Sequence, residues 1–232
     1  MKQLLTILIG TLAIMTLGFT TQPQEPRAER DYVFVFITTG PATDLTDEER
    51  SKAFAGHFAN MKRLGDEGKL LIAGSFGEPK SDPTHRGLFV FDETDPKAGQ
   101  SLAESDPTVD MGVFVMTAHK LTTDEPLLEL LQLDRDAAAK LGEDAPPGSN
   151  ARAYTLATSP FEEGLFEKAG NAEGVLIAAK LHGSGSEGSD QILLWLDAED
   201  EESANQLLPE EGEWALHGWY GSKSVAVLAE SD

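Results

Sequence analysis

Cysteine is absent from the 232-residue chain, which excludes disulfide bonds, lipid-modified cysteine and thiolate metal sites. Basic residues are scarce, with 18 Lys and Arg against 40 Asp and Glu and a formal net charge of −22. A surface with that charge repels nucleic acids and anionic membranes, so neither is expected as a partner. Because the acids are spread along the chain, adaptation to a saline habitat is the favoured explanation, with an acidic binding surface as the alternative.

Long apolar runs are also missing, except near the N-terminus. Lys2 is followed by an uncharged apolar run from Leu4 to about Phe19, and then by polar, proline-containing residues. This layout is typical of a secretory signal, and the run is shorter than the ~20 residues of a membrane-spanning helix. We therefore predict a signal peptide over residues 1–20 and export to the periplasm or beyond, with no integral membrane domain in the mature form. An uncleaved N-terminal membrane anchor is the alternative.

Two parts of the chain resemble each other. The segment LLIAGSF (residues 70–76) resembles VLIAAKL (175–181), and RGLFVFDETD (86–95) resembles QILLWLDAED (191–200). Both comparisons have the same offset of 105 residues. A constant offset across two apolar runs and the loop between them indicates an internal repeat.

The first half has a pattern of strands and helices that indicates the fold class. The expected order is strand, helix, strand, strand, helix, strand, which is that of the ferredoxin-like, split βαβ unit. Such a sheet has one open face, normally buried against a second copy. We predict an α+β fold in which two ferredoxin-like repeats pack sheet to sheet as an intrachain dimeric α+β barrel. The expected elements are strands 31–38, 70–76, 87–92 and 112–121, a helix from Thr46 to Gly68 and a helix capped by Asp95.

The chain is therefore divided into four parts. The signal peptide is followed by a first domain over residues 31–121. A connecting helix and a Pro- and Gly-containing linker occupy residues 122–150, and a second, degenerate copy occupies residues 151–232.

Three motifs of the first half point to one known family. A GKLLIAG run at residues 68–74 follows the helix that carries His57, and Asp106-Pro107 follows the second helix. In these features, over about residues 32–121, the chain resembles the YCII-related (YciI-like) family of small dimeric α+β barrel proteins. The resemblance implies an active site formed by a His and Asp pair in a cleft. Matched by motif, that pair is His57 and Asp106.

The second half departs from this pattern. Its shortened helix region, residues 161–174, contains no His, and Glu211-Gly212 stands where the offset places Asp106-Pro107. We therefore expect one candidate active site in the chain, with the second half as a scaffold.

Each residue of the pair also has a structural interpretation. His57 lies with Phe54, Phe58 and Met61 on the apolar face of its helix, where a lone His is often a core residue. Asp106 before a Pro is a standard N-cap. Both roles of Asp106 are compatible if one carboxylate oxygen caps the helix and the other orients an imidazole that transfers protons.

Two functions remain open at this point. The resemblance implies a cofactor-free enzyme acting on a small organic molecule by isomerisation, elimination or dehydrohalogenation, in a cleft between the open sheet face and the helix bearing His57. Phe54, Phe58 and Ser75 are the candidate substrate-binding residues. The alternative is an exported small-molecule-binding or interaction protein without turnover. Self-association into a homo-oligomer is left open.

Metal and cofactor sites are not expected. The remaining histidines show no zinc-type spacing, and the glycine-rich run 182–190 lacks the Lys and the following helix of a phosphate loop. These histidines are His85, His119, His182 and His217.

Overall fold

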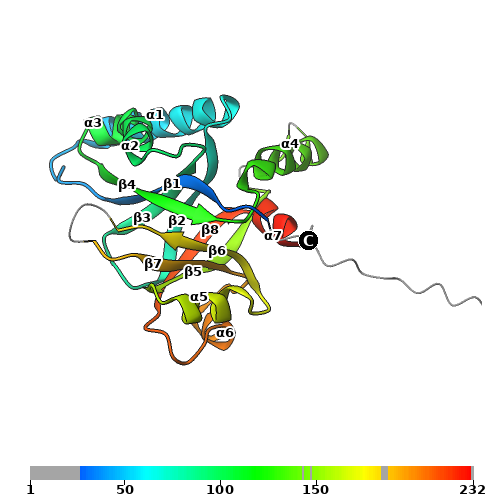
Figure 1. The fold of residues 1–232 in the computed structure, drawn as a ribbon. Helices are drawn as coiled ribbons and strands as arrows, with labels where there is room; N and C mark the ends of the chain where they lie inside the picture. The colour runs from blue at the N-terminus through cyan, green and yellow to red at the C-terminus, as the bar shows by residue number, and fades with distance from the viewer. Residues whose placement is uncertain (1–26, 143, 147, 184–187, 231–232) are drawn as a thin grey trace, which may run out of the picture.

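The computed structural model describes residues 27–142, 144–146, 148–183 and 188–230. The predicted signal peptide lies outside these residues. The described chain forms a barrel of strands with helices on its outside and at one end, which confirms the α+β class (Figure 1). Within the described residues, no helix has the length and apolar character needed to cross a membrane.

The first half contains the predicted elements, with two changes. The second strand continues to Lys80, so a short loop of residues 81–84 connects it to the third strand, where a longer loop was predicted. A short extra helix, α3, follows the second predicted helix. The elements are β1 (Arg30–Thr39), α1 (Asp47–Asp66), β2 (Leu70–Lys80), β3 (His85–Phe91), α2 (Pro96–Glu104), α3 (Pro107–Asp110) and β4 (Phe114–Thr123).

The connecting helix is shorter than the pattern of residues 123–144 predicted. A 3₁₀ turn, η1 (Leu127–Glu129), follows Pro126, and the α-helix α4 (Leu130–Leu141) begins only after it. A final helix, α7, was not predicted. The remaining elements are β5 (Ala151–Pro160), α5 (Glu163–Gly170), β6 (Val175–Leu181), β7 (Gln191–Leu196), α6 (Glu201–Leu207), β8 (Ala215–Ser222) and α7 (Ser224–Glu230).

The strands form one closed barrel in the order β1-β3-β2-β8-β5-β7-β6-β4, and the paired neighbours are antiparallel. Each half of the chain contributes four neighbouring strands. The halves join edge to edge, through β2 with β8 and through β4 with β6. The β4–β6 seam is short, with Leu121 paired to Leu181 and Thr122 to Lys180.

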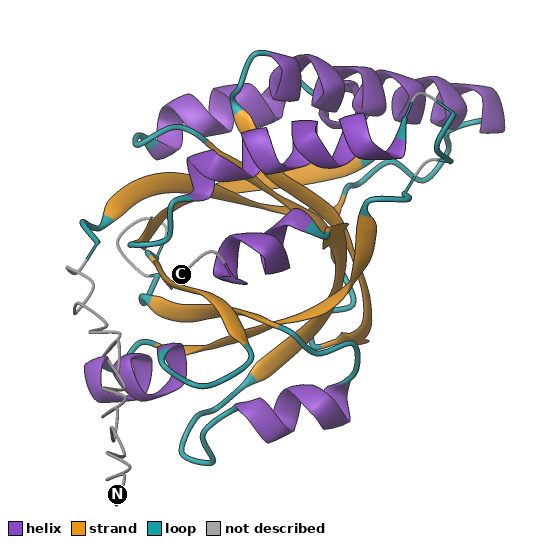
Figure 2. Cartoon of the chain, turned by 90° about the vertical axis from the view of Figure 1, so that its right-hand side faces the viewer, coloured by secondary structure: helices purple, strands orange, loops and turns teal. Residues whose placement is uncertain are grey.

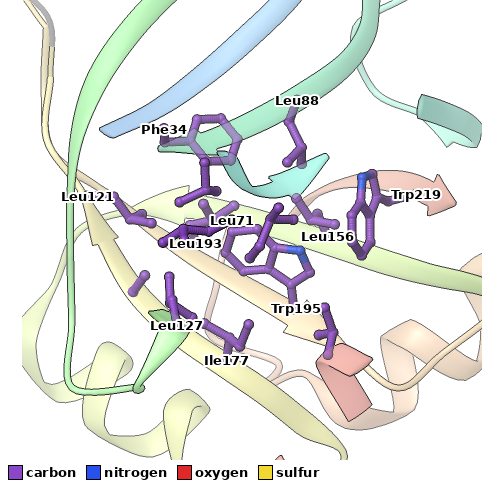
Figure 3. Packing of buried hydrophobic residues seen from close by; sticks show 14 of the residues in the cluster. Phe34, Leu71, Leu88, Leu121, Leu127, Leu156, Ile177, Leu193, Trp195 and Trp219 are labelled. Atoms are coloured by element: carbon purple, nitrogen blue, oxygen red, sulfur yellow. The ribbon is translucent and has the colours of Figure 1, made fainter. Parts of the chain in front are cut away.

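Successive side chains of each strand point to opposite faces of the sheet, and apolar residues gather on both faces. The inner face fills the barrel with side chains from both halves, including Phe34, Leu88, Trp195 and Trp219 (Figure 3). Helix α7 lies at one end of the barrel (Figure 2). Leu127 of η1, Leu130 of α4, and Val225 and Leu228 of α7 join the interior core. On the outer face of the first half, β1 and β3 pack under α1 and α2 through a second cluster: Val33, Val35, Leu64, Phe89, Phe91 and Ala103.

Helix α1 begins and ends where the sequence predicted. Thr46 and Glu49 form the capping box, and Gly68 follows the helix with a φ of +73°, a conformation that favours glycine. The buried face differs from the predicted apolar stripe, because Phe58 is 63% exposed. The buried residues of α1 are Ala53, His57, Asn60 and Leu64.

Candidate functional site

His57 and Asp106 form a buried pair between α1 and the start of α3. The Nδ1 atom of His57 lies 2.8 Å from Oδ2 of Asp106. The side chain of Asp106 has no exposed surface, and that of His57 is 10% exposed. The other carboxylate oxygen, Oδ1, accepts hydrogen bonds from the backbone N–H and the hydroxyl of Thr108. Asp106 is therefore both the N-cap of α3 and the partner of His57.

A close helix–helix contact holds the pair together. A Cβ atom at Gly56 would lie 2.8 Å from Cγ of Pro107, so only glycine at this position lets α1 approach α3 so closely. Asn60, one turn after Gly56, donates a hydrogen bond to the hydroxyl of Ser105 at 3.3 Å. These contacts lie on either side of His57 and fix its distance from Asp106.

The electrostatic environment favours the ionised form of Asp106. Burial alone would raise the pKa of this carboxyl, but hydrogen bonds from His57 and Thr108 outweigh burial and hold the pKa below its usual value. An ionised carboxylate can only accept hydrogen bonds, so Nδ1 of His57 carries the proton. In the neutral imidazole the Nε2 atom then has a free lone pair.

His57 also lines a cavity of about 310 Å³. The walls are mainly apolar and aromatic, and the ring of His57 lies near those of Phe54, Phe58, Phe89 and Phe114, with centroid distances from 5.5 to 6.4 Å. No hydrogen bond joins Nε2 of His57 to any other described residue, which makes this atom the one available to a bound molecule. The lining residues are Ile37, Phe54, His57, Phe58, Met61, Gly74, Ser75, Arg86, Gly87, Phe89 and Phe114.

The structure brings all five predicted site residues to one place. Phe54, Phe58 and Ser75 line the cavity, His57 faces it, and Asp106 lies behind His57. The position of the cavity differs from the prediction. It lies between α1 and the outer, helix-covered face of the sheet, because the open face became the filled interior of the barrel.

Sequence reasoning did not identify Arg86, Phe114 or Thr108 as part of the site. Arg86 and Phe114 line the cavity, and Thr108 bonds Asp106. Thr108 could have been found as the residue two positions after a capping Asp. No local sequence pattern identifies Arg86 as a site residue, because the direction of its side chain depends on the pairing of β1 with β3.

The second half has no equivalent pair within the described residues. Glu211, at the position of Asp106, forms an exposed ion pair with Lys168 of α5 at 2.7 Å.

The other histidines lie elsewhere, mainly around the barrel interior. His85 stacks on Phe36 and lies 5.0 Å from His217 between ring centroids. Burial, with a smaller contribution from His85, lowers the pKa of His217 to about 4. Burial also lowers the pKa of His85, His119 and His182. Within the described residues, no group of three or more His, Asp or Glu side chains is arranged to hold a metal ion.

Comparisons with known proteins identify structures of similar shape only. No family model matches the chain. No curated protein matches it either. One solved structure, a provisionally assigned monooxygenase from Lactobacillus acidophilus NCFM, has a TM-score of 0.43 and 10% identity over 82% of this chain and 93% of its own. Another, the siroheme decarboxylase NirDL with an iron-uroporphyrin III analogue, has a TM-score of 0.42 and 10% identity over 84% of this chain and 71% of its own. Likenesses at this level carry no argument about function.

Proposed function

We propose that this protein is an exported, cofactor-free enzyme that transfers protons to and from a small organic molecule bound beside His57. The observation that carries the proposal is the orientation of His57. Its Nδ1 is held by a buried carboxylate, and its ring faces a cavity. A His oriented in this way, with its second nitrogen directed to a bound molecule, is the usual arrangement of a general base.

The chemistry follows from the protonation states. The neutral His57 takes a proton from a C–H bond next to a carbonyl group of the substrate, and the bonding electrons move into an enolate. The imidazolium that forms is stabilised by the ionised Asp106, which does not itself need to take the proton. Returning the proton to another atom gives isomerisation, and loss of a leaving group from the enolate gives elimination. The apolar cavity keeps water away from the enolate.

The family and the organisation of the chain belong to the same proposal. We place residues 31–121 in the YCII-related family, and residues 151–232 as a degenerate copy that completes the barrel. The order of strands and helices in each half supports a duplicated ferredoxin-like unit. Export by an N-terminal signal over residues 1–20 rests on the charge and hydropathy pattern of that segment.

Hydrogen–deuterium exchange into substrates tests the proposal without knowledge of the product. The mature protein is incubated in D₂O with small carbonyl acids, and proton NMR follows the loss of the C–H signals next to the carbonyl. We expect exchange of at least one compound, and a loss of about 10²–10⁴-fold for His57→Gln. Asp106→Asn should also slow the exchange, because the amide no longer stabilises the imidazolium.

The control is His182→Gln, which removes a half-buried His outside the cavity and should leave the exchange rate unchanged. If no compound exchanges, or if exchange persists in His57→Gln, the enzyme proposal is wrong. Compounds that bind in the cavity without exchange would instead establish the non-catalytic binding protein.

A further inference from the structure

Among the described residues that line the His57 cavity, Arg86 is the one Lys, Arg, Asp or Glu. The protein has 40 Asp and Glu residues, yet none of those that the structure describes lines this cavity. Arg86 is itself exposed, so its positive charge lies where this mainly apolar cavity meets the solvent.

A β-bulge places Arg86 on the cavity side of the sheet. In the pairing of β1 with β3, Ile37 faces Gly87 and Thr38 faces His85, so Arg86 is an extra residue. Simple alternation would place Arg86 with Leu88 in the barrel interior. The bulge instead turns its side chain to the outer face, beside Gly87 and Phe89. Bulges of this kind re-aim side chains next to active sites.

The guanidinium of Arg86 is anchored through Nε, and no hydrogen bond joins its two terminal nitrogens to another described residue. The Nε–H of Arg86 donates a hydrogen bond to Oγ1 of Thr39 at 2.7 Å, and Thr39 in turn donates to the carbonyl of Thr84. No carboxylate of a described residue lies within 4.0 Å of the Arg86 nitrogens. Its two terminal nitrogens remain available in the geometry that binds a carboxylate through two hydrogen bonds.

The rest of the cavity limits the size of the ligand. A volume of about 310 Å³ is at the lower end of ordinary ligand pockets. Phenylalanine rings from α1, β3 and β4 supply flat apolar walls. Gly87 leaves room near Arg86, and it must be glycine because a Cβ there would lie 2.5 Å from the backbone oxygen of Gly74.

We propose that Arg86 binds the carboxylate of the substrate, so that the site is specific for small monoanionic acids with one apolar or aromatic group. The carboxylate pairs with the terminal nitrogens of Arg86, and the apolar group packs against the cavity walls that Phe54, Phe89 and Phe114 supply. The carbon next to the carboxylate then faces Nε2 of His57. This inference rests on the proposed function for the role of His57, but not for the binding step itself.

A matched pair of probes tests the binding step. Phenylacetate carries the carboxylate and one ring, and phenylacetamide has the same shape without the charge. Binding to the mature protein is followed by NMR titration at a constant ionic strength of about 0.15 M, where long-range repulsion by the acidic surface is largely screened. We expect phenylacetate to bind about tenfold more tightly than phenylacetamide.

Arg86→Met should weaken the binding of phenylacetate about tenfold and leave that of phenylacetamide unchanged. Arg50→Met is the matched control, because it changes the net charge equally on an exposed part of α1 that does not line the cavity. Arg86→Lys should retain part of the preference, since a point charge remains without the two-nitrogen geometry.

Equal binding of the two probes, or an unchanged affinity of Arg86→Met for phenylacetate, would overturn the inference. So would an absence of phenylacetate binding up to about 10 mM. The variant His57→Gln shows whether a negative result concerns anion binding by Arg86 or proton transfer by His57. If phenylacetate binds to His57→Gln as it does to the unmodified protein, the anion site stands even where deuterium exchange is never observed.

Discussion

Asp106 uses its two carboxylate oxygens in different ways. Oδ1 accepts from the backbone N–H of Thr108 at 2.9 Å and so caps α3, and Oδ2 bonds His57. Asp95 offers a comparison within the same chain, because it also precedes a proline and caps α2 through the N–H of Lys97 at 3.0 Å. Asp95 is exposed, however, and no His of the described residues bonds its carboxylate.

The two caps give a prediction about stability. Asn caps a helix about as well as Asp, so Asp95→Asn should change the free energy of unfolding little. Asp106→Asn should cost about 1–3 kcal/mol near neutral pH, because the buried charge-assisted bond to His57 is lost. Urea unfolding followed by circular dichroism measures both. Equal costs for the two variants would contradict a special role for the buried pair.

The stabilisation that Asp106 contributes to the folded protein depends on pH. The pKa of Asp106 is lower in the folded protein than its usual value, so the unfolded chain binds its proton more readily. The stabilisation by Asp106 is therefore complete above the usual pKa of an aspartate, about 3.9, and is lost as the pH falls through the folded value. The difference in the free energy of unfolding between the unmodified protein and Asp106→Asn should therefore narrow as the pH falls below about 3.9. Urea unfolding at a series of pH values measures it.

At the scale of elements, the approach of α1 to α3 determines the site. His57 comes from the middle of a 20-residue helix, and Asp106 from the start of a helix of 4 residues. The contact between Gly56 and Pro107 sets the distance between these elements. The site therefore depends on a residue that has no side chain.

Two glycines of α1 test this dependence. Gly56→Ala places a methyl group against Pro107 and should cost about 1–3 kcal/mol of stability, because the helices must separate. It should also weaken the hydrogen-bonded Nδ1 proton signal of His57 in NMR spectra. Gly65→Ala, where no atom lies within 4 Å of the new methyl group, should stabilise the protein by up to about 1 kcal/mol. Stabilisation by both variants would show that the helix contact is unimportant.

At the scale of the whole molecule, the two halves share one interior. Phe34 and Leu88 from the first half pack in the same core as Trp195 and Trp219 from the second (Figure 3). The ring centroids of Phe34 and Trp195 lie 6.2 Å apart. Neither half can bury its inner face without the other, so the halves should unfold together.

The distribution of tryptophan makes this testable. Trp195, Trp214 and Trp219 are the three tryptophans of the chain, and all lie in the second half. Their fluorescence reports on that half, and the NMR signal of His57 reports on the first. We expect both probes to give the same midpoint in urea. Two separate midpoints would mean that the halves are independent domains and that barrel closure adds little stability.

The sequence by itself determined the features that depend on neighbouring residues. The capping box of Thr46 and Glu49 and the N-caps Asp95 and Asp106 were predicted at the positions where the structure has them. They could be predicted because a cap is formed within three or four residues. The strands were predicted from alternation, although the length of β2 was underestimated. The pairing of His57 with Asp106 came only through the family resemblance, since 49 residues separate them.

Tertiary structure decided the features that depend on how distant segments meet. Edge pairing of β2 with β8 and of β4 with β6 turned the open face into a filled interior, and this moved the cavity to the helix-covered side. The bulge that directs Arg86 into the cavity depends on the register of β1 against β3, which no local pattern sets. The exposure of Phe58 was likewise decided by the tertiary structure, because an apolar stripe alone does not fix which of its members face the core.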